Sequence, residues 1–266
     1  MLENQQVTPY DNPEESKKGQ VTKMFDKIAP YYDQLNRVLS LGIDVLWRKR
    51  AIKMLKVENP KTILDIATGT GDLALEAARV IRPDHITGTD ISEKMLEIGR
   101  KKIEKRGLSG MISMDVGDSE HLKYADHSYD AVMVAFGVRN FENLEMGLSE
   151  MFRVLKPNGT VIILEFSKPK VFPLNILFNL YFKYILPVIG KLRSKDEKAY
   201  KYLYESVQAF PDYERFTSIL EKLGYRHINY KALSGGICCI YQAKNNTGSH
   251  FPSYGIMATC PAARCG

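Results

Sequence analysis

The segment Thr62–Ala74, TILDIATGTGDLA, constrains the fold more than any other part of the sequence. Its β-branched and apolar start at 62–66 is typical of a buried strand, Gly69 and Gly71 are typical of a tight turn, and residues 73–81 are typical of a helix opened by that turn. Glycine is needed where the backbone must approach a ligand that a Cβ atom would exclude. The free N–H groups at the start of the helix can hold an anionic group. The segment therefore predicts a nucleotide-binding turn after the first strand of an α/β sheet.

Acidic residues help to distinguish the ligands that such a turn can take. Asp90 ends the next predicted strand and suits a carboxylate that accepts both ribose hydroxyls, a device that NAD enzymes share. Asp65 lies before the turn, where a carboxylate would crowd a pyrophosphate and suits a cationic ligand instead. Asp118 and Ser119 follow the third predicted strand and are placed to meet an adenine edge. These features favour S-adenosyl-L-methionine, which carries an ammonium and a sulfonium, although residues 69–74 also fit the dinucleotide fingerprint or a turn without a ligand.

Strands and helices alternate between residues 61 and 166, which predicts right-handed crossovers and a parallel sheet with ligands at the carboxyl ends of its strands. The predicted strands are 62–66, 85–90, 111–116, 129–136 and 159–166, and the predicted helices are 72–81, 92–106 and 142–155, the last ended by Pro157-Asn158-Gly159. Two closing strands near 225–231 and 236–243 are joined by a short hairpin connection, so at least one of them is antiparallel. This α/β pattern is the Rossmann-like plan of class I S-adenosylmethionine-dependent methyltransferases, with seven strands, mostly parallel, and an antiparallel strand near the C-terminus. A nicotinamide-binding domain would continue in parallel.

The rest of the chain is expected to surround one domain. We predict a disordered N-terminal arm over residues 1–18, a methyltransferase domain over 19–244 and a loose C-terminal tail over 245–266. Within the domain, apolar stripes predict a helical cap at 21–57, and a break in the alternation predicts a substrate-side insertion at 171–209.

Two segments of this region have more than one interpretation. Tyr32 and Asp33 are either surface residues at a helix start or part of a lid over the cofactor. The apolar and aromatic stretch 171–189 is interrupted too often for a transmembrane helix. It suits a buried helix, an apolar wall for a greasy substrate or a helix at a membrane interface followed by lysines and Arg193.

Composition narrows the partners. The 266 residues are 44% hydrophobic and 26% charged, and 37 Lys and Arg against 31 Asp and Glu give a net charge of +6. That excess permits an anionic membrane surface but falls short of a nucleic-acid signature. The polar N-terminus has no signal-peptide pattern, so we expect a cytoplasmic protein. Cys238 and Cys239 are adjacent on a predicted strand and point to opposite faces, and Cys260 and Cys265 lack companion ligands, so neither a disulfide nor a metal site is expected.

Four stretches resemble the ubiquinone/menaquinone biosynthesis C-methyltransferase family: FDKIAPYYDQLNRVLSLGIDVLWR at 25–48, LDIATGTGD at 64–72, AFGVRNF at 135–141 and RVLKPNGTVIILEFSKP at 153–169. YLYESVQAFP and LSGGICCIYQAK are also similar, so the likeness spans roughly residues 20–244. It departs at Asp44, where many members have histidine, at Asn158, where glycine is usual, and at Ala135, which replaces a serine.

This resemblance implies methyl transfer from S-adenosyl-L-methionine to a ring carbon of a polyprenylated hydroquinone. The likeness supports Thr70, Asp90, Asp118 and Ser119 as cofactor contacts, and local geometry adds Asp65, Gly69 and Gly71. On family grounds the expected acceptor is demethylmenaquinol, in menaquinone biosynthesis, with a polyprenyl benzoquinol of ubiquinone biosynthesis as the alternative. A non-catalytic scaffold that binds the cofactor stays a separate possibility, and the exposed aromatics of 171–189 suit a membrane or a homodimer interface.

Carbon is a weak nucleophile, so the ring must be the reduced quinol, and removal of the neighbouring hydroxyl proton strengthens the attack. The candidates for this step are Arg139 and Asn140, in the loop after the fourth strand, and Tyr32 and Asp33 in the cap. Arginine stays protonated, so Arg139 is expected to stabilise the quinolate oxygen while a water takes the proton. A salt bridge that only shapes the loop is the alternative role for Arg139.

Overall fold

A mixed sheet forms the centre of the computed structural model, which describes residues 6–10, 12–185 and 197–246. The seven strands lie in the order β3-β2-β1-β4-β5-β7-β6. They are β1 (Thr62–Ile66), β2 (His85–Asp90), β3 (Ile112–Val116), β4 (Tyr129–Ala135), β5 (Leu155–Phe166), β6 (Tyr225–Leu233) and β7 (Cys238–Asn245). β1 to β5 pair in parallel, whereas β7 pairs antiparallel with both β5 and β6. The predicted class I methyltransferase topology is therefore confirmed.

The start of β5 differs from the prediction. Helix α6 (Leu144–Val154) ends before Leu155, and the Pro157-Asn158-Gly159 turn lies inside β5 rather than at the end of the helix. Leu155 pairs with Tyr129 on β4, after which the register shifts, so pairing with the sheet captures the chain earlier than its local sequence suggests. Asn158 adopts a positive φ of 64° in this irregular segment.

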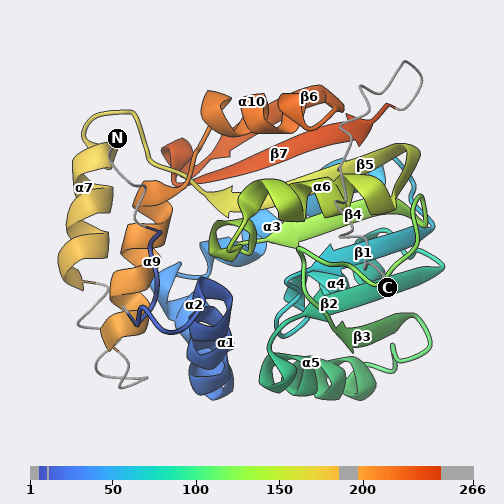
Figure 1. Ribbon diagram of the computed structural model, residues 1–266, viewed down its shortest axis with the longest axis horizontal. Coiled ribbons are helices and arrows are strands. Elements are labelled where there is room, and N and C mark those ends of the chain that lie inside the picture. Colours follow the sequence, from blue (N-terminus) through green and yellow to red (C-terminus); the bar gives the residue numbers. More distant parts are fainter. Residues whose placement is uncertain (1–5, 11, 186–196, 247–266) are drawn as a thin grey trace, which may run out of the picture.

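Helices cover both faces of the sheet (Figure 1). On one face α3 (Ile43–Lys56), α4 (Asp72–Val80) and α5 (Glu93–Lys105) bury an apolar core, and on the other face α6 and α10 (Glu214–Lys222) do so. Cys238 and Cys239 belong to these two separate cores, which confirms that their side chains point to opposite faces. Both are free thiols.

A third core lies beyond the carboxyl ends of the parallel strands, on the left of Figure 1. It joins α1 (Lys17–Ile28) and α2 (Tyr32–Leu39) of the cap to α7 (Leu174–Leu180) and α9 (Glu197–Ala209) of the insertion. Short helical segments lie between the longer elements: η1 (Ala29–Tyr31), η2 (Val138–Asn140), the π-helical η3 (Tyr181–Ile185) and η4 (Ser234–Gly236). The two regions predicted to be additions to the domain thus pack against each other over the end of the sheet where ligands are expected.

The termini and the insertion lie only partly in the described residues. Helix α1 begins at Lys17, inside the arm predicted for residues 1–18, and the Tyr10 N–H donates to Gln20 Oε1 at 2.9 Å. Residues 186–196 of the insertion and 247–266 of the tail, with Cys260 and Cys265, are outside the described residues. Where the structure describes the chain, no helix is long and apolar enough to cross a membrane.

Candidate active site

The glycine turn is held by the carboxylate at the end of β2. Gly69 and Gly71 have positive φ values of 56° and 80°, which glycine adopts without strain. The Gly69 N–H donates to Asp90 Oδ2 at 2.8 Å, and the Ser92 N–H donates to Asp90 Oδ1 at 2.9 Å. Burial raises the pKa of Asp90, and these N–H donors oppose the rise. The turn and the end of β2 therefore form one rigid edge of a cleft.

Strained backbone surrounds the same cleft. Ala67 follows β1 with φ 50°, and Phe136 follows β4 with φ 60°. Positive φ is unfavourable for both residue types, and such strain gathers at functional sites. Gly137 packs so closely that a Cβ atom there would lie 2.6 Å from the Ala67 Cβ. All three line the cleft, so the two strand ends are shaped around it.

Helix α1 lies across this cleft. Lys18, Val21 and Phe25 line it opposite Asp90 and Asp118. Lys18 Nζ forms an ion pair with Asp118 Oδ2 at 2.6 Å. The open volume is about 70 Å³, below the roughly 300 Å³ at which small-molecule sites begin, because the helix occupies part of it.

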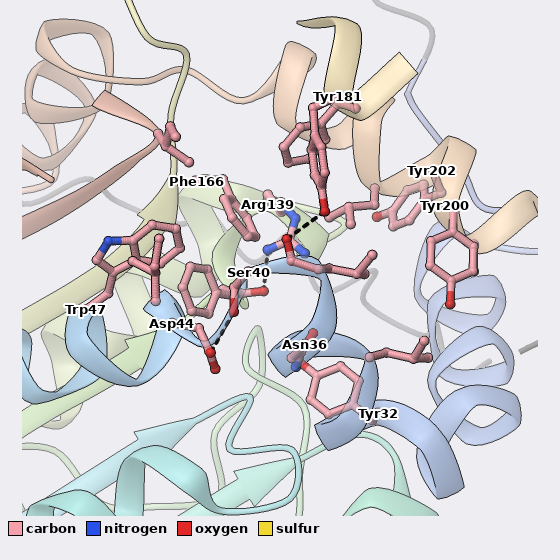
Figure 2. Close-up of a pocket in the computed structure, with 18 of the residues that line it drawn as sticks. Tyr32, Asn36, Ser40, Asp44, Trp47, Arg139, Phe166, Tyr181, Tyr200 and Tyr202 are labelled. Atoms are coloured by element: carbon pink, nitrogen blue, oxygen red, sulfur yellow. Dashed lines mark hydrogen bonds between the residues drawn. The ribbon is translucent and has the colours of Figure 1, made fainter. Parts of the chain in front are cut away.

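A larger apolar cavity of about 310 Å³ lies beside the cleft. It is walled mainly by aromatic and aliphatic side chains of the cap and the insertion, among them Trp47, Phe166, Phe178 and Phe182. Figure 2 labels several of the polar residues that interrupt this wall and shows that they come from different elements: Tyr32, Asn36, Ser40, Asp44, Arg139, Tyr181, Tyr200 and Tyr202. Such a lining suits a hydrophobic ligand with one polar end.

The cleft and the cavity share a wall. Phe25, Tyr32, Phe136 and Asn140 line both. Burial raises the pKa of Tyr32, so its phenol remains protonated near neutrality. A group that bridges the two spaces must pass between these side chains, which makes this wall the place where two bound molecules could react.

Arg139 is fixed beside this wall by a buried ion pair. Its Nη1 lies 2.8 Å from Oε1 of Glu165, whose side chain has no exposed surface. The same nitrogen donates to the Phe136 carbonyl, and the guanidinium lies 5.4 Å from the ring centre of Phe166. Arg139 thus brings a desolvated positive charge to an apolar cavity, a setting in which it interacts strongly with a developing negative charge.

A second charged cluster forms an edge of the cavity on the cap helices. Asp44 is 3% exposed and accepts hydrogen bonds from Arg37, Arg48 and Ser40 Oγ. Arg48 also lies over the ring of Phe136, 5.5 Å from its centre. Asp44, the position at which the sequence departs from the family pattern, is therefore fully paired.

The structure brings only some of the predicted residues to these two spaces. Gly69, Asp90, Asp118 and Ser119 line the cleft, Arg139 lines the cavity, and Tyr32 and Asn140 line both. Thr70 Oγ1 instead donates to Asp33 Oδ1 at 2.6 Å, and Lys102 binds the same carboxylate, so Thr70 and Asp33 join the cap to the turn outside the lining of both spaces. Gly71 also lies behind the lining.

Asp65 lies behind the turn as well. Its side chain accepts from Thr68 Oγ1 at 2.6 Å, and burial raises its pKa to about 7. One carboxylate oxygen, Oδ1, has no hydrogen-bond partner among the described residues. Burial therefore favours the protonated carboxyl, and a cation close to the turn would stabilise the ionised form of Asp65.

Some residues of the site were not predicted from the sequence. Glu165 could have been, because an acid within the apolar run TVIILEF requires a buried partner. No sequence signal pointed to Lys18 or Tyr202, since both belong to helices whose faces are decided by packing. In the described part of the chain, no cluster of three or more His, Cys, Asp or Glu side chains is arranged to hold a metal ion.

Comparison with known proteins identifies the chain's relatives. The model of the ubiE/COQ5 methyltransferase family matches residues 13–245. A demethylmenaquinone methyltransferase of Bacteroides fragilis is 47% identical over 239 residues, which are 90% of this chain and 97% of that one. A ubiquinone/menaquinone biosynthesis C-methyltransferase of Geotalea daltonii is 46% identical over 85% of this chain and 97% of its own length. These matches include the residues of both the cleft and the cavity.

Solved structures share the fold. A possible histamine N-methyltransferase of Thermotoga maritima has a TM-score of 0.60 at 18% identity, over 84% of this chain and 99% of that one. The [4+2]-cyclase SpnF has a TM-score of 0.59 at 17% identity, over 86% and 97%. Because a protein described as a cyclase shares this architecture, the fold alone does not define the reaction.

Proposed function

The chain belongs to the ubiE/COQ5 methyltransferase family, and from that premise we propose that it transfers the methyl group of S-adenosyl-L-methionine to a ring carbon of demethylmenaquinol. The relatives named for menaquinone chemistry support a polyprenylated naphthoquinol as the acceptor. A polyprenyl benzoquinol is the second candidate, because a relative of similar identity is named for both quinones.

The observation that carries this proposal is the shared wall between a polar cleft and an apolar cavity. The cleft, with Gly69, Asp90 and Asp118, suits a nucleotide, and the cavity suits a ring with a hydrocarbon tail. A methyl donor and a lipid-like acceptor held in these two spaces would meet at Tyr32, Phe136 and Asn140. Holding them in line is the main contribution that a protein makes to such a displacement.

The residues of the cleft fit the cofactor. Asp90 lies at the position for ribose hydroxyls. Asp65 is buried behind the turn, outside the lining of the cleft, and a cation bound on the other side of the turn would favour its ionised form. When bound, S-adenosyl-L-methionine supplies a methyl group already activated by its sulfonium. The chain binds and orients it, and the apolar side chains of the wall exclude water.

The hydroxyl proton leaves before the new carbon–carbon bond replaces the carbon–sulfur bond, and the ring C–H proton is lost afterwards while the oxygen is reprotonated, which restores the quinol. The chain's own residues act on the hydroxyl proton and on the oxygen that it leaves. Arg139 stabilises the quinolate oxygen, while a water accepts the hydroxyl proton because arginine stays protonated. Asn140, fixed by its Nδ2 hydrogen bond to the Phe136 carbonyl at 3.3 Å, faces the same oxygen. Tyr32 positions the ring against the cofactor. Asp33 orders the cap by its bonds to Thr70 and Lys102.

Turnover tests the proposed function. The purified protein is incubated with methyl-labelled cofactor and with either reduced demethylmenaquinone or the matching reduced benzoquinone, and each product is identified by mass. Methylation of the naphthoquinol is expected. Cofactor binding with no methylated product from either ring would instead support a scaffold, and product from the benzoquinol alone would reverse the choice of acceptor.

Paired variants test the role of Arg139 without leaving a buried charge alone. The double variant Arg139→Gln/Glu165→Gln removes the ion pair, and Glu165→Gln alone keeps the guanidinium as a matched control. We expect the single-turnover rate of the double variant to fall at least about tenfold below that of the control. Rates within about threefold, worth less than ~0.7 kcal/mol, would remove Arg139 from the mechanism. Tyr32→Phe is assayed at saturating cofactor, and a single-turnover rate within about threefold of wild type would remove Tyr32 from the mechanism.

We also propose that the protein contacts the membrane peripherally from the cytoplasmic side. Leu41 and Leu177 both line the cavity and are exposed at the surface, and Ile176 and Leu180 continue this exposed apolar area along α7. A polyprenyl tail could pass from the ring site to this surface along Leu41 and Leu177, which line the cavity and are exposed. A lipid bilayer is the partner that fits such a tail, and a homodimer through the same face is the other occupant to be tested.

A further inference from the structure

Three buried polar atoms of the apolar cavity have no hydrogen-bond partner among the described residues. They are Arg139 Nε, Asn140 Oδ1 and the Tyr202 hydroxyl. All three residues line the cavity, and Tyr202 is only 2% exposed. An unsatisfied buried polar group costs about 1–3 kcal/mol, so three such atoms on residues that line one cavity call for an explanation.

The three atoms complement an oxygen of a hydroquinone. Arg139 offers an N–H donor, Asn140 offers its unpartnered carbonyl oxygen as an acceptor, and the Tyr202 hydroxyl can do either. A ring hydroxyl donates one hydrogen bond and accepts others, and after ionisation it only accepts. All three atoms can therefore bind the neutral quinol, and the two donors, on Arg139 and Tyr202, can bind the quinolate.

Tyr202 belongs to the same electrostatic environment as Arg139. It lies on α9, across the cavity, and Figure 2 shows its hydroxyl directed toward the side where Arg139 lies. Burial raises the pKa of Tyr202, the positive charge of Arg139 opposes that rise, and Glu165 adds to it. The phenol stays protonated at neutral pH and can donate its proton in a hydrogen bond.

We propose that the Tyr202 hydroxyl donates a hydrogen bond to the quinol oxygen that faces Arg139 and Asn140, and that it stabilises this oxygen as its proton leaves. Asn140 also lines the cofactor cleft, so an oxygen held there lies next to the ring carbon that faces the methyl donor. The inference rests on the proposed function and gives the insertion a direct part in the reaction. If the Tyr202 hydroxyl did not contact the substrate, α9 would only close the cavity.

The test compares Tyr202→Phe with Tyr225→Phe. Tyr225 is also fully buried, but its hydroxyl donates to the Leu148 carbonyl at 2.9 Å, in a core away from both cavities. Tyr202→Phe is expected to lower kcat by about ten- to hundredfold, as loss of an oxyanion donor does, while its melting temperature stays level or rises. Tyr225→Phe should show the reverse: a lower melting temperature with kcat unchanged.

Two further measurements separate substrate contact from a structural role. A donor to the quinolate lowers the pKa of the bound quinol, so Tyr202→Phe should move the alkaline rise of kcat to higher pH. Binding of a short-chain naphthohydroquinone is followed by quenching of Trp47, the single tryptophan and a cavity residue, and should weaken severalfold in the variant.

The outcomes distinguish this inference from the proposed function. A kcat within about threefold of wild type, an unmoved pH profile or a melting temperature lowered as in Tyr225→Phe would each overturn the role of Tyr202. If the wild type methylates neither quinol, the proposed function fails. In that case the Trp47 titration still decides whether the Tyr202 hydroxyl binds the hydroquinone.

Discussion

At the scale of single residues, Gly69 is required for two separate reasons, its backbone conformation and the space that a ligand needs. Its φ of 56° strains any other residue, but the nearest atoms to an added Cβ, Met95 Cε at 3.5 Å and Tyr32 Cε1 at 3.9 Å, leave ordinary contacts. The space that the Cβ would take belongs to the cofactor cleft. Glycine is thus required here for both reasons, whereas at Gly107, with φ 66° and no neighbour within 4 Å, only conformation matters.

Gly69→Ala and Gly107→Ala should therefore lose similar stability and differ in cofactor binding. Each substitution places a Cβ in the left-handed region, at about 1–2 kcal/mol in the free energy of unfolding. Only Gly69→Ala should weaken S-adenosyl-L-methionine binding, by at least about tenfold. Urea denaturation and isothermal titration measure the two quantities, and equal affinities in both variants would show that the cofactor does not approach Gly69.

Asp65 makes stability depend on pH in an unusual direction. Its pKa rises from the ordinary 3.8 to about 7 because the side chain is buried. The folded state therefore keeps a proton that the unfolded chain releases, and stability falls as pH rises from about 4 through 7. Asp65→Asn removes this loss and should be more stable than wild type by on the order of 2–4 kcal/mol at pH 8, with a much smaller difference at pH 4.

Denaturation curves between pH 2 and 8 check this expectation, with Asp130→Asn as a comparison because the pKa of Asp130 is shifted in the opposite direction. The hydrogen bonds to Lys156, Thr62 and Lys61 outweigh the effect of burial and lower the pKa of Asp130 to about 2, so its contribution is present near neutrality and is lost on acidification from about 4 toward 2. A constant difference between wild type and Asp65→Asn across the pH range would mean that Asp65 is ionised throughout.

At the scale of elements, helix α1 controls entry to the cofactor cleft. Lys18 Nζ lies 2.6 Å from Asp118 Oδ2, on the carboxylate predicted to meet the adenine, and the open volume of the cleft is about 70 Å³. We therefore expect cofactor binding to displace the Lys18 side chain. Part of the binding free energy is spent on that change.

Lys18→Met should tighten S-adenosyl-L-methionine binding by about three- to tenfold, because the competing ion pair is gone while the aliphatic stem is kept. Lys23→Met is the matched control on the same helix, since Lys23 pairs with Glu15 away from the cleft. Isothermal titration gives both affinities. Weaker binding by Lys18→Met would show that Lys18 holds the cofactor rather than competing with it.

At the scale of the whole molecule, an exposed apolar face on α7 adjoins the apolar cavity. Helix α7 buries Phe178 in the third core and exposes Ile176 and Leu180, which lie one helical turn apart. Val57, at the end of α3, is 83% exposed but lies outside the cavity lining. A membrane that receives the prenyl tail would cover the α7 face and leave Val57 in water.

Ile176→Ser/Leu180→Ser should reduce binding to vesicles containing phosphatidylglycerol at least about tenfold, because two apolar side chains no longer enter the bilayer. Val57→Ser should bind as the wild type does. Co-sedimentation with vesicles measures both, and sedimentation velocity without lipid tests the alternative occupant. Unchanged vesicle binding, together with a dimer that the double variant dissociates, would assign this face to a second copy of the chain.

The sequence by itself determined the sheet and its cofactor edge. Alternating apolar strands, the turn at Gly69 and the acid at Asp90 are local patterns, and the carboxyl ends of parallel strands must meet at one edge, so fold class and cleft follow from them. The family resemblance added the reaction.

Which polar groups line the apolar cavity, by contrast, follows from how the elements pack. Asp33 and Thr70 bond to each other, Glu165 fixes Arg139, and Tyr202 reaches the same cavity from a distant helix. A helix turns each side chain by the same angle along the chain, but which face becomes the wall of a cavity depends on the elements packed around it. That choice is made by long-range packing between the cap and the insertion, which local sequence patterns do not encode.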